Sequence, residues 1–279
     1  MKTQVRGAAL LLSAGIAVSL AIGMLAAGRT ANAAGPTTVG LGTADGFAVL
    51  AGSGITNTGS SVINGDIGSH PTTSITGFPP GIVNGVNHGG DAVTQGAKND
   101  LTTAYNDAAG RTPVTTKPTE LGGSTLVPGV YRSSAGTFGI TGTVTLDGRG
   151  DPNAVFIFKM ASTLTTATGS NVRLIGEAQS CNVFWQVGSS ATLGGSTSFK
   201  GNILAKTSIT LVTSATINGR ALARNGAVTL DTNTITRSTC SIPTPTPTPG
   251  PTASPGPTAS PGPTASPGPT ATPSGAIRK

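Results

Sequence analysis

The stretch Gly201-Asn-Ile-Leu-Ala-Lys-Thr-Ser-Ile-Thr-Leu211 returns later as Gly219-Arg-Ala-Leu-Ala-Arg-Asn-Gly-Ala-Val-Thr-Leu230. The matching leucine, alanine and basic positions lie 18 residues apart, and the final leucines lie 19 apart. A period near 18 accommodates three short strands and three corners, which make one coil of a parallel β-helix. Such coils stack at about 4.8 Å, so a residue type that recurs once per coil forms a straight row on a flat side. We therefore predict an all-β, three-sided solenoid and look for function in its surface rows.

Both ends of the 279-residue chain differ from its middle. Lys2 and Arg6 precede an apolar stretch and the small-residue site Ala31-Asn-Ala33, which predicts a cleaved signal peptide over residues 1–33, with a retained N-terminal anchor as the alternative. Residues 242–279 are rich in Pro, Thr, Gly and Ser and offer no apolar face, so we expect a disordered spacer there. One domain remains at 34–241, and the signal predicts a secreted or cell-surface protein.

The charged residues of this domain exclude several functions. It holds 12 Lys and Arg against 10 Asp and Glu, scattered along the chain, whereas nucleic-acid binding needs clustered cations. Polysaccharide-active β-helix enzymes need clustered carboxylates, but Asp66, Asp147 and Asp151 stand beside Gly as turn residues do. His70 and His88 lack the spacing of metal ligands. We expect no catalytic residues, no metal and no cofactor.

The sequence also predicts a disulfide and one α-helix. Cys181 and Cys240 are the only cysteines of a chain with an export signal, which predicts a disulfide, with two unpaired buried thiols as the alternative. A helix of about 18 residues is predicted after the N-cap Asp91 and before Gly110, packed along one flank of the solenoid. Its apolar stripe, at three- and four-residue spacing, is Val93, Ala97, Leu101, Ala104, Tyr105 and Ala108.

Two polar rows emerge when the coils are aligned on their inward leucines. The first row is Thr163, Thr192, Thr210 and Thr229, with Ala161, Ser190, Ser208 and Ala227 as small neighbours two residues earlier. The second is Ser198, Thr216 and Thr234, and the remaining side carries Lys206 and Arg224. Threonine has a high β propensity, so solvated strands alone could explain such rows. The scarcity of charge favours a functional surface instead.

Six stretches of the chain resemble the secreted microbial ice-binding proteins, a family with a discontinuous right-handed β-helix and a flanking α-helix. They are Leu41-Gly-Thr-Ala-Asp-Gly-Phe-Ala-Val-Leu50, Ile63-Asn-Gly-Asp-Ile-Gly68, Leu101-Thr-Thr-Ala-Tyr-Asn-Asp-Ala-Ala-Gly-Arg111, Leu126-Val-Pro-Gly-Val-Tyr131, Asn182-Val-Phe-Trp-Gln-Val187 and Gly201-Asn-Ile-Leu-Ala205. The resemblance implies a monomer that adsorbs to ice through one flat side. A short motif associated with that side in some members occurs here once in a coil region, as Thr168-Gly-Ser-Asn171.

The functional hypothesis is therefore an antifreeze or ice-recrystallisation-inhibiting protein. We expect ice to adsorb on the first row, because it spans four coils and its neighbours are small, and we keep the second row as the alternative. A surface or matrix adhesin without ice affinity is the alternative function, and the Pro-Thr tail leaves contact with cell wall or glycan open.

Overall fold

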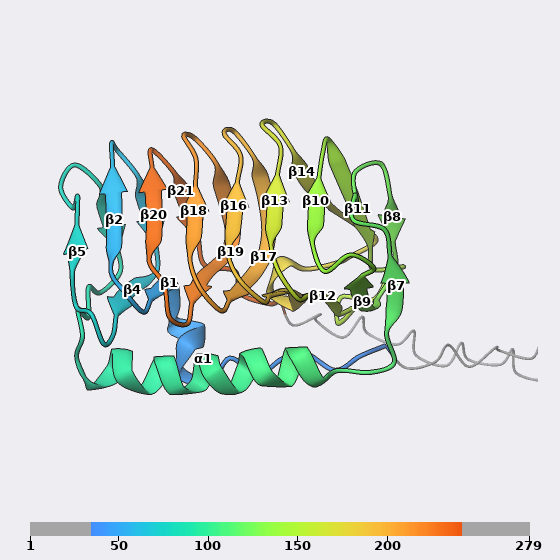
Figure 1. Cartoon of the computed structure of the whole chain (residues 1–279), viewed down its shortest axis with the longest axis horizontal. Coiled ribbons are helices and arrows are strands. Elements are labelled where there is room, and N and C mark those ends of the chain that lie inside the picture. The colour runs from blue at the N-terminus through green and yellow to red at the C-terminus, as the bar shows by residue number, and fades with distance from the viewer. Residues whose placement is uncertain (1–34, 242–279) are drawn as a thin grey trace, which may run out of the picture. The chain divides into compact units, whose positions relative to one another are not determined.

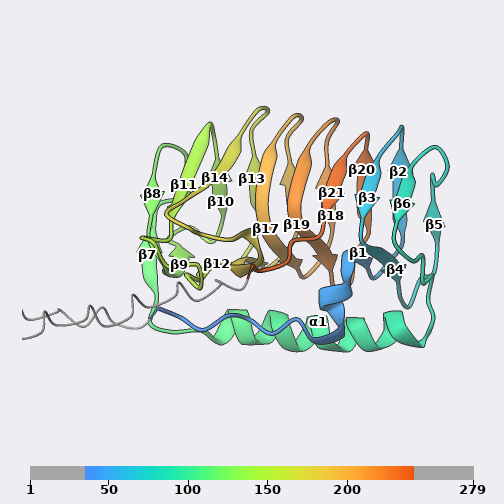
Figure 2. The same cartoon turned by 180° about the vertical axis from the view of Figure 1, so that it is seen from behind.

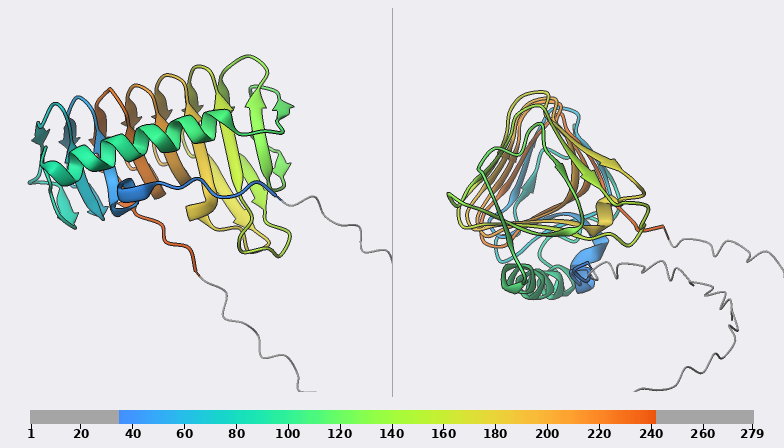
Figure 3. Two further views of the ribbon diagram at one scale, coloured as in Figure 1. Left: turned by 90° about the horizontal axis from the view of Figure 1, so that it is seen from below. Right: turned by 90° about the vertical axis from the view of Figure 1, so that its right-hand side faces the viewer.

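The computed structural model describes residues 35–241, which form a solenoid of triangular cross-section with one long helix alongside (Figure 3). The predicted signal peptide and tail lie outside the described residues. The three sides confirm the predicted β-helix, and every strand pair in it is parallel. Within residues 35–241 no helix has the length and apolarity needed to cross a membrane.

The first side is a parallel sheet of seven short strands that lie side by side in Figure 1. In spatial order they are β10 (Phe138–Ile140), β13 (Leu164–Thr166), β16 (Ala191–Leu193), β18 (Ile209–Leu211), β20 (Val228–Asp231), β2 (Ile55–Thr58) and β5 (Ile75–Thr76).

The other two sides belong to one 14-stranded sheet that bends around a corner (Figure 2). Its two longest strands, β17 (Ser198–Ala205) and β19 (Thr216–Ala223), run across both sides and turn at Gly201 and Gly219, whose positive φ values of 111° and 147° favour glycine. The second side also holds β8 (Thr125–Leu126), β11 (Thr143–Asp147), β14 (Asn171–Ile175), β21 (Thr234–Thr236), β3 (Val62–Asn64) and β6 (Ile82–Asn84). The third side also holds β7 (Thr115–Lys117), β9 (Gly129–Ser133), β12 (Phe156–Met160), β15 (Val183–Val187), β1 (Phe47–Ala51) and β4 (Asp66–Ser69).

The coils do not stack in the order of the sequence. Strand β2 pairs with β20 and β1 pairs with β19, so the N-terminal coils continue the C-terminal ones. The chain then returns along the solenoid through α1 (Ala92–Gly110) and begins the opposite end with β7 (Figure 1). This arrangement confirms the discontinuous β-helix and the expectation that coils precede and follow the helix in the sequence.

Helix α1 begins and ends close to the predicted positions. Asp91 is its N-cap, and its carboxylate accepts a hydrogen bond from the Thr94 backbone N–H at 2.8 Å. The predicted stripe is wrong at Val93, which is 49% exposed because the buried face starts one residue later. Lys98 lies on that face, where burial, aided by the neighbouring Arg224, lowers its pKa to about 8. The buried residues are Thr94, Ala97, Lys98, Leu101, Ala104, Tyr105 and Ala108.

Two hydrophobic layers hold the fold together. Inside the solenoid, Tyr131, Phe158 and Trp185 occupy matching positions in successive coils, and the rings of Phe158 and Trp185 stack with centroids 4.0 Å apart. The second layer lies between the third side and α1, where Leu50, Leu204 and Leu222 are fully buried. The third side is therefore covered. Of the two cations expected on a charged side, Lys206 is exposed at the corner after β17, whereas Arg224 packs its guanidinium over the Tyr105 ring, 4.7 Å from the centroid.

The predicted disulfide is present between Cys181 and Cys240, whose Cα atoms are 5.5 Å apart. Cys181 belongs to the short 3-10 helix η2 (Ser180–Asn182) that precedes β15. The bond therefore fastens the last described residues to an earlier coil.

Candidate functional site

Six of the seven strands of the first sheet each carry one threonine in register with the next. Strand pairing places Thr165 beside Thr192, Thr192 beside Thr210, and Thr210 beside Thr229. The same column continues into the N-terminal coils. Its members are Thr165, Thr192, Thr210, Thr229, Thr56 and Thr76, with Gly139 beside Thr165 at one end, and we call these six threonines the threonine row.

The alternation of short strands points these side chains outward. In β16 the residues on either side of Thr192 are Ala191 and Leu193, which are 1% and 0% exposed and pack in the core. Since successive side chains of a strand point to opposite faces, Thr192 must face solvent. The same buried–exposed–buried pattern recurs in β13, and in β18 with Thr210 half-buried. Adjacent members of the row are therefore held at the strand spacing of about 4.8 Å.

The structure corrects the register that the sequence predicted at one coil. Thr165, not Thr163, stands beside Thr192, because Leu164 pairs with Ala191 rather than with Leu193. Thr163 instead joins the column of small residues: its carbonyl accepts a hydrogen bond from the preceding coil, as the carbonyls of Ser190, Ser208 and Ala227 do. Ala161 lies further back, before β13 begins, and so leaves the predicted set. A two-residue shift keeps the inward and outward faces unchanged, so alternation alone could not detect it.

Sequence reasoning missed Thr56 and Thr76. Their strands, Ile55-Thr-Asn-Thr58 and Ile75-Thr76, carry the same Ile-Thr pair as Ile209-Thr210. This repeated Ile-Thr pair is the sequence signal that could have identified Thr56 and Thr76. It was hidden because the neighbour of Thr56 in the sheet is Thr229, far away in the sequence.

The surroundings of the threonine row are small and almost uncharged. On one side, Ser190, Ser208 and Ala227 continue into Gly54 and Ser74. Within the seven strands the only charged residue is Asp231, at the end of β20. Its carboxylate accepts hydrogen bonds from the hydroxyls of Thr213 and Thr232.

The alternative row exists but is less uniform. Ser198, Thr216 and Thr234 are in register on the second side, as predicted. Their column continues into Val62 and then Ile82, which is 55% exposed. Two residues after Ser198 on β17, Lys200 adds a cation to this side, and Arg173 adds another on the neighbouring strand β14. A lattice of like groups is therefore longer on the first side.

The acidic residues have structural partners. One carboxylate oxygen of Asp66 accepts the Val86 N–H, and those of Asp147 and Asp151 accept the N–H groups of Arg149 and Asn153. The contacts of Asp147 and Asp151, each with the N–H two residues later, confirm the turn interpretation for these two. It is wrong for Asp66, which begins strand β4 and accepts from a residue 20 positions later in the sequence. Among residues 35–241 no group of three or more His, Cys, Asp or Glu is placed to hold a metal ion.

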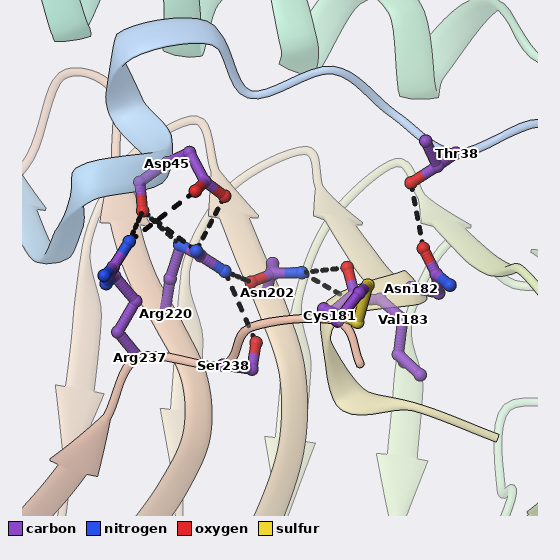
Figure 4. A network of polar contacts seen from close by, with 10 residues as sticks. Thr38, Asp45, Cys181, Asn182, Val183, Asn202, Arg220, Arg237 and Ser238 are labelled. Atoms are coloured by element: carbon purple, nitrogen blue, oxygen red, sulfur yellow. Dashed lines mark hydrogen bonds and ion pairs between the residues drawn. A yellow bond between two sulfur atoms is a disulfide. The ribbon is translucent and has the colours of Figure 1, made fainter. Parts of the chain in front are cut away.

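A buried polar network ties the N-terminal segment to the solenoid beneath α1 (Figure 4). Arg220, only 1% exposed, donates to the carboxylate of Asp45 at 2.7 Å and to the side-chain oxygen of Asn202 at 2.8 Å. Burial lowers the pKa of Arg220 to about 10, although Asp45 acts against that shift. Asn202 in turn donates to the carbonyl of Cys181 at the disulfide. The network lies away from the threonine row and braces the coils that carry it.

Comparisons with known proteins agree on one family. A family model described as Ice-binding-like matches residues 49–236. The chain is 52% identical over 200 residues to an ice-binding protein of Nostoc sp. (strain HG1), an alignment that covers 71% of this chain and 74% of the relative. A crystal structure of an ice binding protein from an Antarctic biological consortium has a TM-score of 0.70 and 51% identity and covers 74% of this chain and 93% of that one. The ice-binding protein of the Antarctic ascomycete Antarctomyces psychrotrophicus gives a TM-score of 0.70 at 43% identity, with 73% of this chain and 100% of that chain covered.

Proposed function

Because the chain belongs to the Ice-binding-like family, we propose that it binds ice and that the threonine row makes the contact. The register of the row is the observation that supports this choice: six threonines, one per coil, stand on a sheet with a single charged residue. Each threonine offers a methyl and a hydroxyl group at a fixed repeat. Such a surface can order water in a pattern close to an ice plane, whereas charged groups impose their own hydration.

Several further properties belong to the proposal. The family is one of ice-binding proteins rather than of enzymes, and we propose that this chain has no catalytic activity and needs no cofactor. We also propose a monomer that is secreted after cleavage behind Ala33, with the tail as a spacer. The Cys181–Cys240 disulfide supports an oxidising compartment. The comparisons give no support to the adhesin alternative.

The test is a pair of matched substitutions on two sides of the solenoid. Thr210→Tyr places a bulky ring at the middle of the threonine row, and Thr216→Tyr does the same on the alternative row. We expect Thr210→Tyr to abolish thermal hysteresis and Thr216→Tyr to retain it. Both melting temperatures should stay close to that of the wild type, because surface substitutions change stability by about 0.5 kcal/mol or less.

Two other outcomes would contradict this assignment of the ice contact. Full activity in Thr210→Tyr with loss in Thr216→Tyr would assign ice to Ser198, Thr216 and Thr234. Full activity in both variants would remove the ice contact from both sides. Thermal hysteresis at matched concentration and inhibition of ice recrystallisation are the two readouts.

A further inference from the structure

Four cations that are scattered in the sequence gather along one flank of the solenoid. Arg132 and Lys159 are partners in the pairing of β9 with β12. Lys206 and Arg224 directly follow the paired strands β17 and β19, so they lie side by side at the corner between the third and first sides. The set extends over the neighbouring strands β9, β12, β15, β17 and β19, a length of about 19 Å at the strand spacing of about 4.8 Å. We call these four residues the basic flank.

The side chains of the basic flank point away from the solenoid core. Both sequence neighbours of Lys159 pack in that core, so Lys159 itself faces outward, and its partner Arg132 is exposed. Lys206 is exposed at its corner, and Arg224 is half-buried beside α1. The four cations can therefore meet a partner that lies along this flank.

The protein does not neutralise the charge of the basic flank. Among residues 35–241 none of its four cations forms an ion pair with a carboxylate, and the buried Nε of Arg224 has no hydrogen-bond partner there. Burial lowers the pKa of Lys159, and its neighbour Arg132 adds to that shift. Burial and then Arg224 likewise lower the pKa of Lys98 to about 8. Cations that repel one another in this way are stabilised by an anionic partner.

The acidic residues inside α1 contact the N-terminal segment instead. Asp100 accepts hydrogen bonds from the backbone N–H and the hydroxyl of Thr43, at 2.7 and 2.6 Å. Asp107 pairs with Arg111 at 2.7 Å, and Arg111 also donates to the Thr37 hydroxyl. Figure 3 shows the N-terminal segment running along α1 below the third side. The carboxylates of the helix are therefore engaged with this segment, and the basic flank keeps its positive charge.

The surroundings of the basic flank exclude several anionic partners. Cations spread over about 19 Å cannot share one small anion, so the partner is a chain with repeated charges. The neighbouring rings of Tyr105 and Tyr131 are 7% and 4% exposed, so the bases of a nucleic acid have no ring on which to stack. A membrane would take up large exposed apolar side chains, but these lie on β6, in the loop after it, at the start of α1 and after β18: Ile82, Val86, Val93 and Val212.

An acidic peptide also fits this flank poorly. Extended peptides add to the free edge of a sheet, whereas β9, β12, β15, β17 and β19 are each paired on both edges. A polymer whose own backbone needs no strand partner remains, and arginine binds its carboxylates through paired N–H donors. We propose that the basic flank binds a linear acidic polysaccharide with carboxylates on its sugar units, a function beyond ice binding. None of the four cations belongs to the strands of the first side, so the bound polymer leaves the threonine row free.

The experiment titrates a fluorescently labelled oligomer of galacturonic acid with the purified protein and follows fluorescence anisotropy. We expect saturable binding that weakens steeply between about 0.02 and 0.2 M salt, because the contacts join opposite charges. A neutral glucose oligomer of the same length should not bind. The double variant Arg132→Gln with Lys206→Gln removes two exposed cations of the basic flank and should weaken binding about tenfold or more.

The matched control removes two cations from the second side, Arg173→Gln with Lys200→Gln. Both double variants lower the net charge equally, yet the control should bind the oligomer as the wild type does. The flank variant should keep its melting temperature and full thermal hysteresis, and Thr210→Tyr should bind the oligomer normally, so the two proposed functions fail independently. The proposal is overturned if the oligomer gives no saturable binding, if the two double variants lose affinity equally, or if an oligothymidylate or an anionic lipid vesicle binds the flank more tightly than the oligomer does.

Discussion

Replacing Gly139 by threonine should lengthen the threonine row and raise ice activity. Gly139 is the partner of Thr165 in β10 and is the one position of the column without a side chain. The substitution adds a seventh hydroxyl and methyl group in register with the other six. If each threonine contributes equally, the adsorption free energy grows by roughly one sixth, since the contact scales with area.

A Cβ atom fits at Gly139. A Cβ atom at Gly139 would meet Glu120 Oε2 at 3.4 Å and the Thr119 carbonyl at 3.9 Å, which is ordinary van der Waals contact. The residue is not among those with positive φ, so threonine needs no strained backbone. Removing a glycine from a strand interior should stabilise the fold by about 0.5 to 1 kcal/mol. By contrast, a Cβ at Gly194, after strand β16, would lie 2.6 Å from the Thr166 carbonyl, so a side chain does not fit there.

The assay compares thermal hysteresis of Gly139→Thr and the wild type across matched concentrations, with melting temperatures from calorimetry. The matched control is Val62→Thr, which extends the alternative row beside Thr234 with an isosteric residue. We expect a gain in Gly139→Thr and none in Val62→Thr. A folded Gly139→Thr protein without any gain would refute the reasoning that row length sets adsorption, and a gain in Val62→Thr alone would place ice on the second side.

Two further predictions concern charge. Asp231→Asn removes the only charge from the seven strands while keeping a polar partner for Thr213, so thermal hysteresis should rise. The control Asp147→Asn should leave thermal hysteresis unchanged. A loss of activity in Asp231→Asn would mean that the carboxylate itself helps to order water. The unfolding free energy should rise between about pH 8 and 10.5, because over that window the unfolded chain still binds the Lys98 proton that the folded chain has lost. Calorimetry across this range should show a flatter profile for Lys98→Met, and an unchanged slope in that variant would assign the pH dependence to other groups.

The features that are local in sequence could be predicted, and those set by register across coils could not. The N-cap Asp91 and the Cys181–Cys240 pair follow from neighbouring residues or from a count, and the structure confirms both. Thr163 and Thr165 lie two residues apart, so their side chains point to the same face of the sheet. Only the pairing of Leu164 with Ala191 shows that Thr165, not Thr163, stands beside Thr192. For Thr56, sequence alone does not show which coil will be its neighbour.

Lys98 shows a different limit of sequence reasoning. A lysine in a helical pattern normally marks the solvated face, yet here it is 8% exposed and donates to the carbonyls of Ala223, at 2.5 Å, and Arg224. Those carbonyls belong to the end of β19 and the corner after it. Because they accept from Lys98, the charge is tolerated on the buried face of α1. The signal for that contact lies in the packing of two distant segments, not in the helix itself.

The parts of the fold that never contact the threonine row still determine its geometry. Neighbouring strands of an open sheet twist by roughly 20 to 25° relative to one another, and such a twist would break a straight row of threonines. Here each strand is joined to two other sides of its coil, and the stacked rings of Tyr131, Phe158 and Trp185 keep successive coils aligned from within. Helix α1 spans the solenoid from the outside (Figure 1). Its Lys98 donates to the carbonyl of Ala223 and so fastens the helix to the third side. A flat surface of like groups therefore depends on the aromatic core and the helix, and the sequence must specify both before six threonines can act as one surface.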